Sequence, residues 1–324
     1  MKISLPIALL ALIGLLAACG EPEPDDPPEP VIEDDGLTDP DFIEIQAGTF
    51  VMGFSEGEPF TGPDEVPRSV TLTRDFLIQS TEVTQGQWFK IMGESRPAFF
   101  SGCGQECPVE RVNWFEAALF LNTLSERDGL PTCYTLVGCV GEPSTGCQLP
   151  DCGPPDRCEQ SSCEGSFVCQ EATFAGLDCA GWRLPTEAEW EFAARAGSED
   201  SIQNGLLEPP IDCSTPNVAL DAVGWYCANA DSRTQPVATR NANNHGLFDV
   251  SGNVREWVHD AYAADVAQRD ALDPTGPDEP TLGRVVRGGS WASNGADCRL
   301  ARRLADDPAR RSHTTGFRPV RTLP

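Results

Sequence analysis

The sequence predicts an α+β fold, in which short strands and capped helices alternate along the chain. Residues 42–53 alternate apolar and polar side chains in part, a pattern that favours strands. Residues 183–197 contain the pattern of a capped amphipathic helix. Two short stretches near the end, 284–286 and 316–320, indicate further strands. Together these patterns indicate an α+β fold, and the length of 324 residues permits one or two domains.

The first part of residues 42–324 is expected to contain two strand regions followed by two helices. Residues 42–53 are predicted to form a strand pair that turns at Gly48, and residues 70–83 have a similar pattern. Glycines are expected to end the helices at 84–93 and 113–129. The second of these helices begins with an asparagine that can cap it, followed by a glutamate three positions later.

The later helix carries the strongest local signals. Thr186 and Glu189 have the spacing of a capping box. Glu191 and Arg195 are spaced for an i,i+4 ion pair. Glu187 and Glu189 could be catalytic carboxylates, but capping and the helix dipole account for both, and we expect them to be structural. The inward face is predicted to consist of Trp190, Ala193, Ala194 and Gly197.

The N-terminal region is predicted to be an export signal and a spacer. Residues 1–18 hold a lysine followed by an apolar run that is too short to span a membrane comfortably. The small residues before Cys19 resemble a bacterial lipobox, which implies that Cys19 is lipidated and anchors the chain to a membrane. An ordinary secretory signal with a coincidental cysteine is the alternative. Residues 19–41 are rich in proline and acidic groups, which favours a disordered linker.

The charge balance restricts the partners. The chain has 50 acidic and 23 basic side chains and a formal charge of -27. Such a field repels phosphate backbones, so we expect no nucleic-acid partner. Acidic surfaces suit cations, and many serve solubility alone.

The expected location is the cell envelope, where the protein would be lipid-anchored at the outer membrane or the periplasmic face. An unknown protein or peptide is expected as the ligand.

Cysteines are concentrated in one block. The chain has 14 in all, and eight of them fall within residues 133–179. This segment has almost no apolar periodicity, so burial cannot hold it, and we expect a disulfide-rich insertion. Export to an oxidising compartment favours pairing. A zinc site is the alternative for this block, although it contains no histidine.

The remaining cysteines suggest two more pairs and one odd thiol. Cys103 and Cys107 are four residues apart and could close a small loop. Cys213 and Cys227 flank a probable turn region and could close another. If the first cysteine of the chain is lipidated, this scheme leaves Cys298 unpaired. Counting alone does not establish the pairing, but it makes an unpaired Cys298 a specific hypothesis.

A tight turn within residues 244–262 offers oxygen ligands. Asp249 and Glu256 lie on either side of Gly252 and Asn253. Two carboxylates with glycine-freed backbone between them can gather oxygens around a hard cation such as Ca²⁺. On spacing alone, a turn with an Asx cap and no metal explains the same residues equally well.

These segments, in this order, resemble the sulfatase-modifying factor or formylglycine-generating enzyme family. The matching motifs are AGTF and MG within 47–53, EVT at 82–84, PV and VNW within 108–114, RLPTEAEWEFAARAG at 183–197, HGLFDVSGNVREW at 245–257, RGGSW at 287–291 and GFRP at 316–319. The resemblance covers the chain from about residue 42 to its end. It implies a single mixed α/β domain with extensive loops, little regular secondary structure and bound calcium.

The resemblance also implies a reaction. In catalytic members, two cysteines five residues apart bind Cu(I), and O₂ is used to oxidise a sulfatase cysteine to formylglycine. The second cysteine matches Cys298, whereas the first falls on Ser293. Cu(I) prefers soft thiolates and binds a hydroxyl poorly, so a serine there should remove the two-thiolate site. Arg255 also replaces a tryptophan that is common in the family motif.

For calcium, the resemblance implies two sites. The first would take side-chain oxygens and backbone carbonyls from Asp249, Gly252, Val254 and Glu256. The second would involve the side chain of Asn217 and the carbonyl of Val218.

Two functions of different kinds follow, and the sequence leaves open whether the protein is an enzyme. One is a copper- and O₂-dependent oxidoreductase that makes formylglycine and uses Cys298. The other is a non-catalytic surface lipoprotein that binds a ligand or partner. A third idea, an iron-dependent sulfoxide synthase, needs several metal-binding histidines. The chain has three histidines, which we expect at the surface: His245, His259 and His313.

Overall fold

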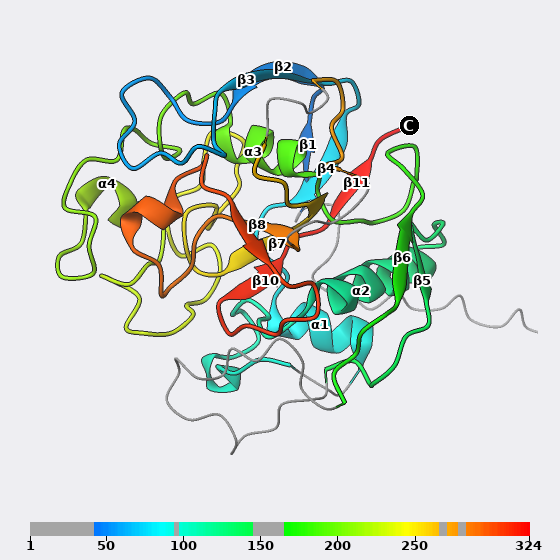
Figure 1. Cartoon of the computed structure of the whole chain (residues 1–324). Coiled ribbons are helices and arrows are strands. Elements are labelled where there is room, and N and C mark those ends of the chain that lie inside the picture. The colour runs from blue at the N-terminus through cyan, green and yellow to red at the C-terminus, as the bar shows by residue number, and fades with distance from the viewer. Residues whose placement is uncertain (1–41, 94–96, 145–164, 266–270, 278–282) are drawn as a thin grey trace, which may run out of the picture. The chain divides into compact units, whose positions relative to one another are not determined.

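The computed structural model describes residues 42–93, 97–144, 165–265, 271–277 and 283–324 (Figure 1). Short strands and helices are joined by long irregular segments, as the α+β prediction requires. No helix within the described residues is long and apolar enough to cross a bilayer. The predicted lipidation site Cys19, the signal peptide and the linker lie outside the described residues.

The strands of the described residues form four small sheets. The largest has the order β10-β7-β8-β9, in which β10 is parallel to β7 and the other neighbours are antiparallel. Its strands are β7 (Arg255–Ala261), β8 (Arg284–Arg287), β9 (Leu304–Asp306) and β10 (Thr315–Phe317). An antiparallel sheet has the order β1-β4-β11, with β1 (Phe42–Ile45), β4 (Phe76–Gln79) and β11 (Val320–Thr322). Two hairpins complete the set: β2 (Gly48–Met52) with β3 (Arg68–Leu72), and β5 (Tyr134–Val137) with β6 (Glu171–Phe174).

The expectation of a strand pair within 42–53 is wrong. This segment does form two strands, β1 and β2, but β1 pairs with β4 and β2 pairs with β3. Gly48 begins β2, where it lies opposite Leu72. The backbone N–H of Ala47, between the two strands, donates to the Asp75 carboxylate at 2.6 Å. Two strands that are consecutive in the sequence therefore pair with different strands. The alternation of apolar and polar residues does not specify the pairing partner.

The helices begin where their caps are expected. They are α1 (Gln85–Met92), α2 (Trp114–Arg127), α3 (Glu187–Arg195) and the single turn α4 (Val218–Asp221), with 3₁₀ turns η2 (Ser101–Cys103) and η3 (Gly295–Cys298). Thr84, Asn113 and Thr186 each complete a capping box. In each box the side chain at the third helical position accepts from the backbone of the cap residue, so two helix-end donors are satisfied at once.

Helix α3 is anchored by buried ion pairs. Glu187 pairs with Arg303, and Glu189 pairs with Arg183. These contacts support a structural role for both glutamates. The expected pair between Glu191 and Arg195 is present at 2.8 Å. Three of the four residues expected on the inward face are buried, whereas Gly197 is exposed because it follows the helix end.

Three apolar clusters form the interior of the part of the chain that the structure describes. The largest lies around α1 and α2 and contains the fully buried Trp88, Trp114 and Trp257. The second contains Trp190 and the inner faces of β3 and β4. A smaller third cluster, made of Ile202, Leu207, Leu220, Val223 and Tyr226, also encloses Cys298. The residues around Cys298 are thus distant in sequence and brought together only by the fold.

The described cysteines pair as the spacing suggested. Disulfides join Cys103 to Cys107 and Cys213 to Cys227. Within the predicted insertion, two further disulfides are Cys133–Cys179 and Cys139–Cys169. Cys298 is a free, buried thiol. The other four cysteines of the insertion, namely Cys147, Cys152, Cys158 and Cys163, lie outside the described residues.

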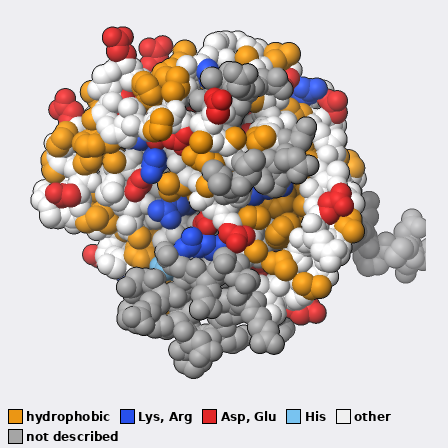
Figure 2. All heavy atoms as spheres, in the orientation of Figure 1, with side chains coloured by type: hydrophobic (Ala, Val, Ile, Leu, Met, Phe, Trp, Pro, Cys, Tyr) orange, Lys and Arg blue, Asp and Glu red, His pale blue; other side chains and the backbone are white. Residues whose placement is uncertain are grey.

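The side chains on one face of the protein match the acidic composition. Figure 2 shows acidic groups spread over this face and out to its rim. Basic groups are fewer and lie mainly toward its middle.

Candidate functional site

The loop that follows β8 brings its own backbone against Cys298. Gly289 has a φ of +74°, a conformation that other residues rarely adopt. A Cβ at this position would lie 2.7 Å from the sulfur of Cys298. Glycine is therefore required here both for the turn and for the close approach of the backbone to the thiol.

Ser293 and Cys298 lie around the same backbone group. The N–H of Ser290 donates to the Ser293 hydroxyl at 3.0 Å, and the same group is close enough to the Cys298 thiol to act on its pKa. The Ser290 and Ser293 hydroxyl oxygens are 3.1 Å apart. The fold thus brings together the two positions that the sequence motif singled out, one with a thiol and the other with a hydroxyl.

The thiol of Cys298 is poorly suited to ionise. Its side chain is completely buried within the third apolar cluster. Burial raises the pKa of Cys298 to about 12, and the charge of Asp297 adds to this effect. The positive charge of Arg255 and the Ser290 hydrogen bond act in the opposite direction without overcoming burial. At neutral pH the group is a protonated thiol.

Arg255, at the start of β7, lies beside this pair. Its Nη2 donates to the Ser293 hydroxyl and its Nη1 donates to the Thr314 hydroxyl, both at 3.3 Å. Its Nε is shielded from solvent and has no hydrogen-bond partner. Desolvation lowers the pKa of Arg255 from its ordinary value. The site therefore contains a cation held by two long hydrogen bonds to neutral groups.

Aromatic rings form one wall beside the loop. Trp291 contacts Phe100 edge-on, with ring centres 5.3 Å apart, and it also lies against the ring of His313. The buried carboxylate of Glu110 accepts from the backbone N–H groups of Phe99 and Phe100. Desolvation raises the pKa of Glu110 to about 8. Glu110 thus fixes the segment that carries the aromatic wall.

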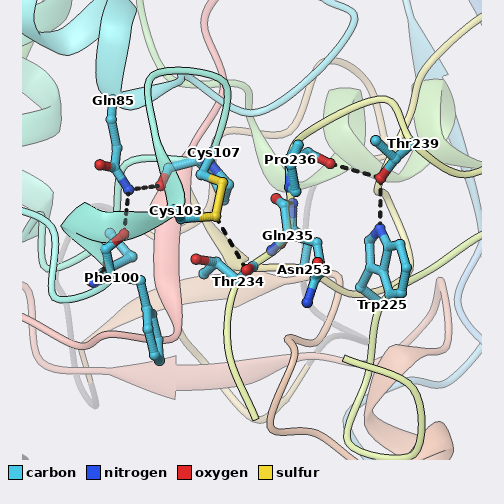
Figure 3. The surroundings of a disulfide bond; sticks show 12 residues. Gln85, Phe100, Cys103, Cys107, Trp225, Thr234, Gln235, Pro236, Thr239 and Asn253 are labelled. Atoms are coloured by element: carbon cyan, nitrogen blue, oxygen red, sulfur yellow. Dashed lines mark hydrogen bonds between the residues drawn. A yellow bond between two sulfur atoms is a disulfide. The ribbon is translucent and has the colours of Figure 1, made fainter. Parts of the chain in front are cut away.

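The small disulfide loop holds the other end of this segment. Figure 3 shows the Cys103–Cys107 disulfide, with Gln85 and Phe100 near it and Thr234 on its far side. The sulfur of Cys103 lies 3.4 Å from the Thr234 carbonyl oxygen, and Gln85 donates to the Phe100 carbonyl oxygen at 3.4 Å. A covalent closure that begins three residues after the aromatic pair restricts the positions that Phe100 can take.

The predicted first calcium region contains a buried acidic cluster. Both oxygens of Glu256 accept from Arg318, at 2.6 and 2.7 Å, and one also accepts from Trp190. Asp249 accepts from the backbone N–H of Ala238 through one oxygen, while its Oδ1 has no hydrogen-bond partner. The Oε2 of Glu82 is also buried without a partner. The cluster thus holds two unsatisfied carboxylate oxygens.

The electrostatics of this cluster favour a neutralising species. Desolvation raises the pKa of Asp249 to about 6. The pKa of Glu82 is raised well above its usual range by burial and by the charge of Asp249. One arginine offsets one of the three acids, so a cation or protons must compensate the others. Within the described residues, no group of three or more acidic, cysteine or histidine side chains has the arrangement of a formed metal site.

The other residues predicted as calcium ligands differ in how well their surroundings suit that role. Gly252 has a φ of +137° and packs against the Trp225 carbonyl, and Val254 is fully buried. The side-chain oxygen of Asn217 caps α4 by accepting from the N–H groups of Ala219 and Leu220. The side chain of Val218 is 88% exposed, although its carbonyl is the expected ligand. In the second predicted calcium site, the Asn217 side-chain oxygen is therefore already engaged in hydrogen bonds.

Two histidine expectations are wrong. His259 and His313 are buried, each with 8% exposure, rather than lying at the surface. His259 packs between the rings of Phe174 and Tyr134. Desolvation and neighbouring arginines lower its pKa well below the usual range, so it is neutral. Aromatic neighbours from distant segments decide this burial, and local polarity in the sequence does not reveal them.

Similarity to known proteins identifies the family of this chain. A family model described as the sulfatase-modifying factor enzyme 1-like domain matches residues 28–323. The chain belongs to this family. The formylglycine-generating enzyme of Streptomyces coelicolor is 28% identical to it, over 85% of this chain and 87% of that protein. The chaperone protein LppX of Paenibacillus barcinonensis is 31% identical, over 78% of this chain and 79% of that protein.

A solved structure shows the same fold. Treponema denticola variable protein 1 has a TM-score of 0.67 and 31% identity, and the match covers 87% of this chain and 95% of that one. The mixed α/β architecture expected for the family is therefore confirmed. Three buried residues near the candidate sites were not singled out by sequence reasoning: Glu82, Glu110 and Thr314. Of these, Glu82 lies in the EVT family motif, which offered the one available signal.

Proposed function

We propose that this protein is a lipid-anchored member of the sulfatase-modifying factor family that binds a ligand or partner and does not carry out copper chemistry. The observation that carries the proposal is the Ser293–Cys298 pair. A hydroxyl stands where a two-thiolate site needs its first sulfur, and the hydroxyl oxygen is engaged by the N–H of Ser290. The domain retains the family fold around this altered pair.

The donor set does not fit Cu(I). Cu(I) favours soft thiolate ligands, and this pair offers a single thiol. The pKa of that thiol is raised to about 12, so deprotonating it at neutral pH is unfavourable. Cys298 does match one of the two family cysteines. An oxidoreductase that uses this single thiol is therefore the alternative function.

The envelope location has its own support. The disulfides among the described residues are typical of proteins exposed to an oxidising compartment. One relative is named a chaperone protein, a name that describes that protein and is compatible here with binding rather than oxidation. Lipidation at Cys19 is proposed from the sequence and is tested by incorporation of labelled palmitate, which Cys19→Ser should abolish.

Copper binding and product formation test the absence of the reaction. The purified protein is titrated with Cu(I) against a chromophoric chelator, and is then incubated with O₂ and a cysteine-containing sulfatase peptide. We expect neither tight copper binding nor an aldehyde product. Ser293→Cys supplies the second sulfur and should tighten Cu(I) binding by orders of magnitude. Aldehyde formed by the unmutated protein and lost in Cys298→Ala would establish the alternative function instead.

Binding is tested with envelope proteins. Cross-linking of the anchored protein in cells, followed by mass spectrometry, should recover a specific partner, and that partner should bind the purified domain. The variant Cys298→Ala should bind it equally well, because the thiol is not expected to contact the partner. Loss of binding in this variant, with its fold intact, would contradict a purely structural role for the thiol.

We further propose that Ca²⁺ has a structural role in this domain. The unpartnered oxygens of Asp249 and Glu82 supply hard donors of the kind that Ca²⁺ prefers. Glu256 is a weaker candidate than the sequence suggested, since Arg318 and Trp190 already occupy its oxygens. A cation beside Asp249 and Glu82 would relieve the repulsion between them.

A further inference from the structure

We propose that Arg255, together with the hydroxyls of Ser293 and Thr314, is a recognition site for a carboxylate group carried by the ligand. This inference deepens the proposed binding function and rests on it. It assigns a chemical class to the ligand and a residue to its recognition.

Buried arginines in this protein are paired with acids. Seven arginines among the described residues are at most 4% exposed, and each forms an ion pair with a glutamate. They are Arg183, Arg195, Arg287, Arg299, Arg303, Arg311 and Arg318. This pairing is expected, because a desolvated guanidinium without a counter-charge is strongly destabilising.

Arg255 is more exposed than these seven arginines and has no such ion pair within the described residues. It is partly buried, and no carboxylate of the described residues lies at ion-pair distance from it. A guanidinium has five N–H donors. Two of them reach hydroxyls at 3.3 Å, and the Nε donor has no partner. One N–H on each terminal nitrogen therefore remains for an external acceptor, and two adjacent N–H groups match the two oxygens of a carboxylate.

The groups around Arg255 are suited to an anion. Hydroxyl pairs flank the guanidinium on two sides: Ser290 with Ser293, and Ser312 with Thr314. All four side chains are buried, with at most 8% exposure. Hydroxyls can rotate to donate to an incoming oxyanion, so the cradle can adapt without backbone movement.

Nearby acids do not cancel the positive charge. Asp297 and Asp306 both lie close enough to influence Arg255. Each has another partner, since Asp297 pairs with Arg302 at 3.0 Å and Asp306 pairs with Arg310 at 3.3 Å. Arg310 also adds positive charge near Arg255. The local balance therefore leaves Arg255 available to a negatively charged group from outside.

Arg284 provides a matched comparison. It too is partly buried and lacks a carboxylate at ion-pair distance among the described residues. Its guanidinium stacks on the Trp114 ring at 4.0 Å and donates to the His259 carbonyl at 2.6 Å. An aromatic face and a short hydrogen bond compensate this cation. Among the described residues, neither an aromatic face nor a short hydrogen bond compensates Arg255, which marks it as the site that needs a ligand.

The test uses acetate as a probe, with acetamide as its neutral isostere. The side-chain N–H signals of Arg255 are followed by NMR during titration of the purified protein. We expect a saturable shift with acetate and none with acetamide. Arg255→Gln should weaken acetate binding at least tenfold, Arg255→Lys should retain part of it, and Arg284→Gln should leave it unchanged. Thermal melting checks that each variant is folded.

Three results would overturn the inference. They are equal responses to acetate and acetamide, acetate binding to Arg255→Gln as strong as to the unmutated protein, and binding of inorganic phosphate in place of acetate. Because the titration requires neither copper nor a partner, it is independent of the tests of the proposed function. A partner that binds Arg255→Gln as tightly as the unmutated protein would refute this assignment and leave the binding function standing.

Discussion

At the residue scale, the environment of a side chain decides its chemistry. Cys298 is located at the position of a family ligand, yet its surroundings are those of a core residue. Glu110 is a carboxylate that the fold uses to hold two backbone N–H groups. Both have a pKa above the ordinary value, and in both the first cause is desolvation.

We predict that Cys298 in the folded protein resists alkylation. With its pKa raised to about 12, the thiolate population at pH 8 is about a thousandfold below that of an ordinary cysteine. Iodoacetamide labelling, located by mass spectrometry, should be correspondingly slow in buffer and rapid in guanidinium chloride. Equal labelling rates in the two conditions would contradict the buried, protonated thiol.

Glu110 predicts a pH dependence of stability. Its folded pKa of about 8 is above the value near 4.5 expected for an unfolded chain. Between these values the folded state binds more protons, so this stabilising contribution is lost as pH rises through about 8. Denaturant unfolding of Glu110→Gln should show a flatter decline over that window than the unmutated protein. The exposed Glu106→Gln is the control, and equal slopes for all three proteins would refute the assignment.

At the element scale, helix starts could be predicted and strand partners could not. A capping box is a local interaction between residues three apart, so its sequence signature is nearly complete. Strand pairing depends on a second segment that alternation does not identify, which is why β1 and β2 were wrongly expected to pair with each other.

The cap of α3 yields a quantitative prediction. Thr186→Ala removes the hydroxyl that accepts from the backbone N–H of Glu189 and should lower the free energy of unfolding by about 1–2 kcal/mol. Chemical denaturation measures this change. Thr135→Ala, at an exposed position of β5, is the control and should change stability by less than about 0.5 kcal/mol. A loss no larger than that of the control would show that the cap contributes nothing measurable.

At the scale of the whole molecule, ion pairs connect the two ends of the domain. Arg299 is fully buried and donates to Glu58 and Glu65, both at 2.8 Å. These residues are more than 230 positions apart in the chain. Arg299→Met would leave two buried acids without their cation and should lower stability by about 3–5 kcal/mol in denaturant unfolding. The control Arg127→Met breaks a partly exposed pair with Asp128 and should change stability by less than about 1 kcal/mol.

Bound Ca²⁺ is expected to stabilise the whole domain. Adding Ca²⁺ should raise the melting temperature, and a chelator should lower it, because a bound cation stabilises only the folded state. Asp249→Asn should reduce the response, whereas the exposed Asp212→Asn should retain it. A melting temperature that is the same with Ca²⁺ and with chelator would exclude a structural calcium in this protein.

The family, the capped helices and the two short disulfide loops could be predicted from the sequence, and the unpaired thiol at Cys298 could be stated as a hypothesis. Each of these depends on residues close together in the chain or on ordered motifs. Three further properties depend on the folded arrangement: Ser293 accepts from the N–H of Ser290 beside Cys298, His259 is buried, and no carboxylate of the described residues lies at ion-pair distance from Arg255. These properties depend on desolvation and on neighbours from distant segments, which folding alone brings together.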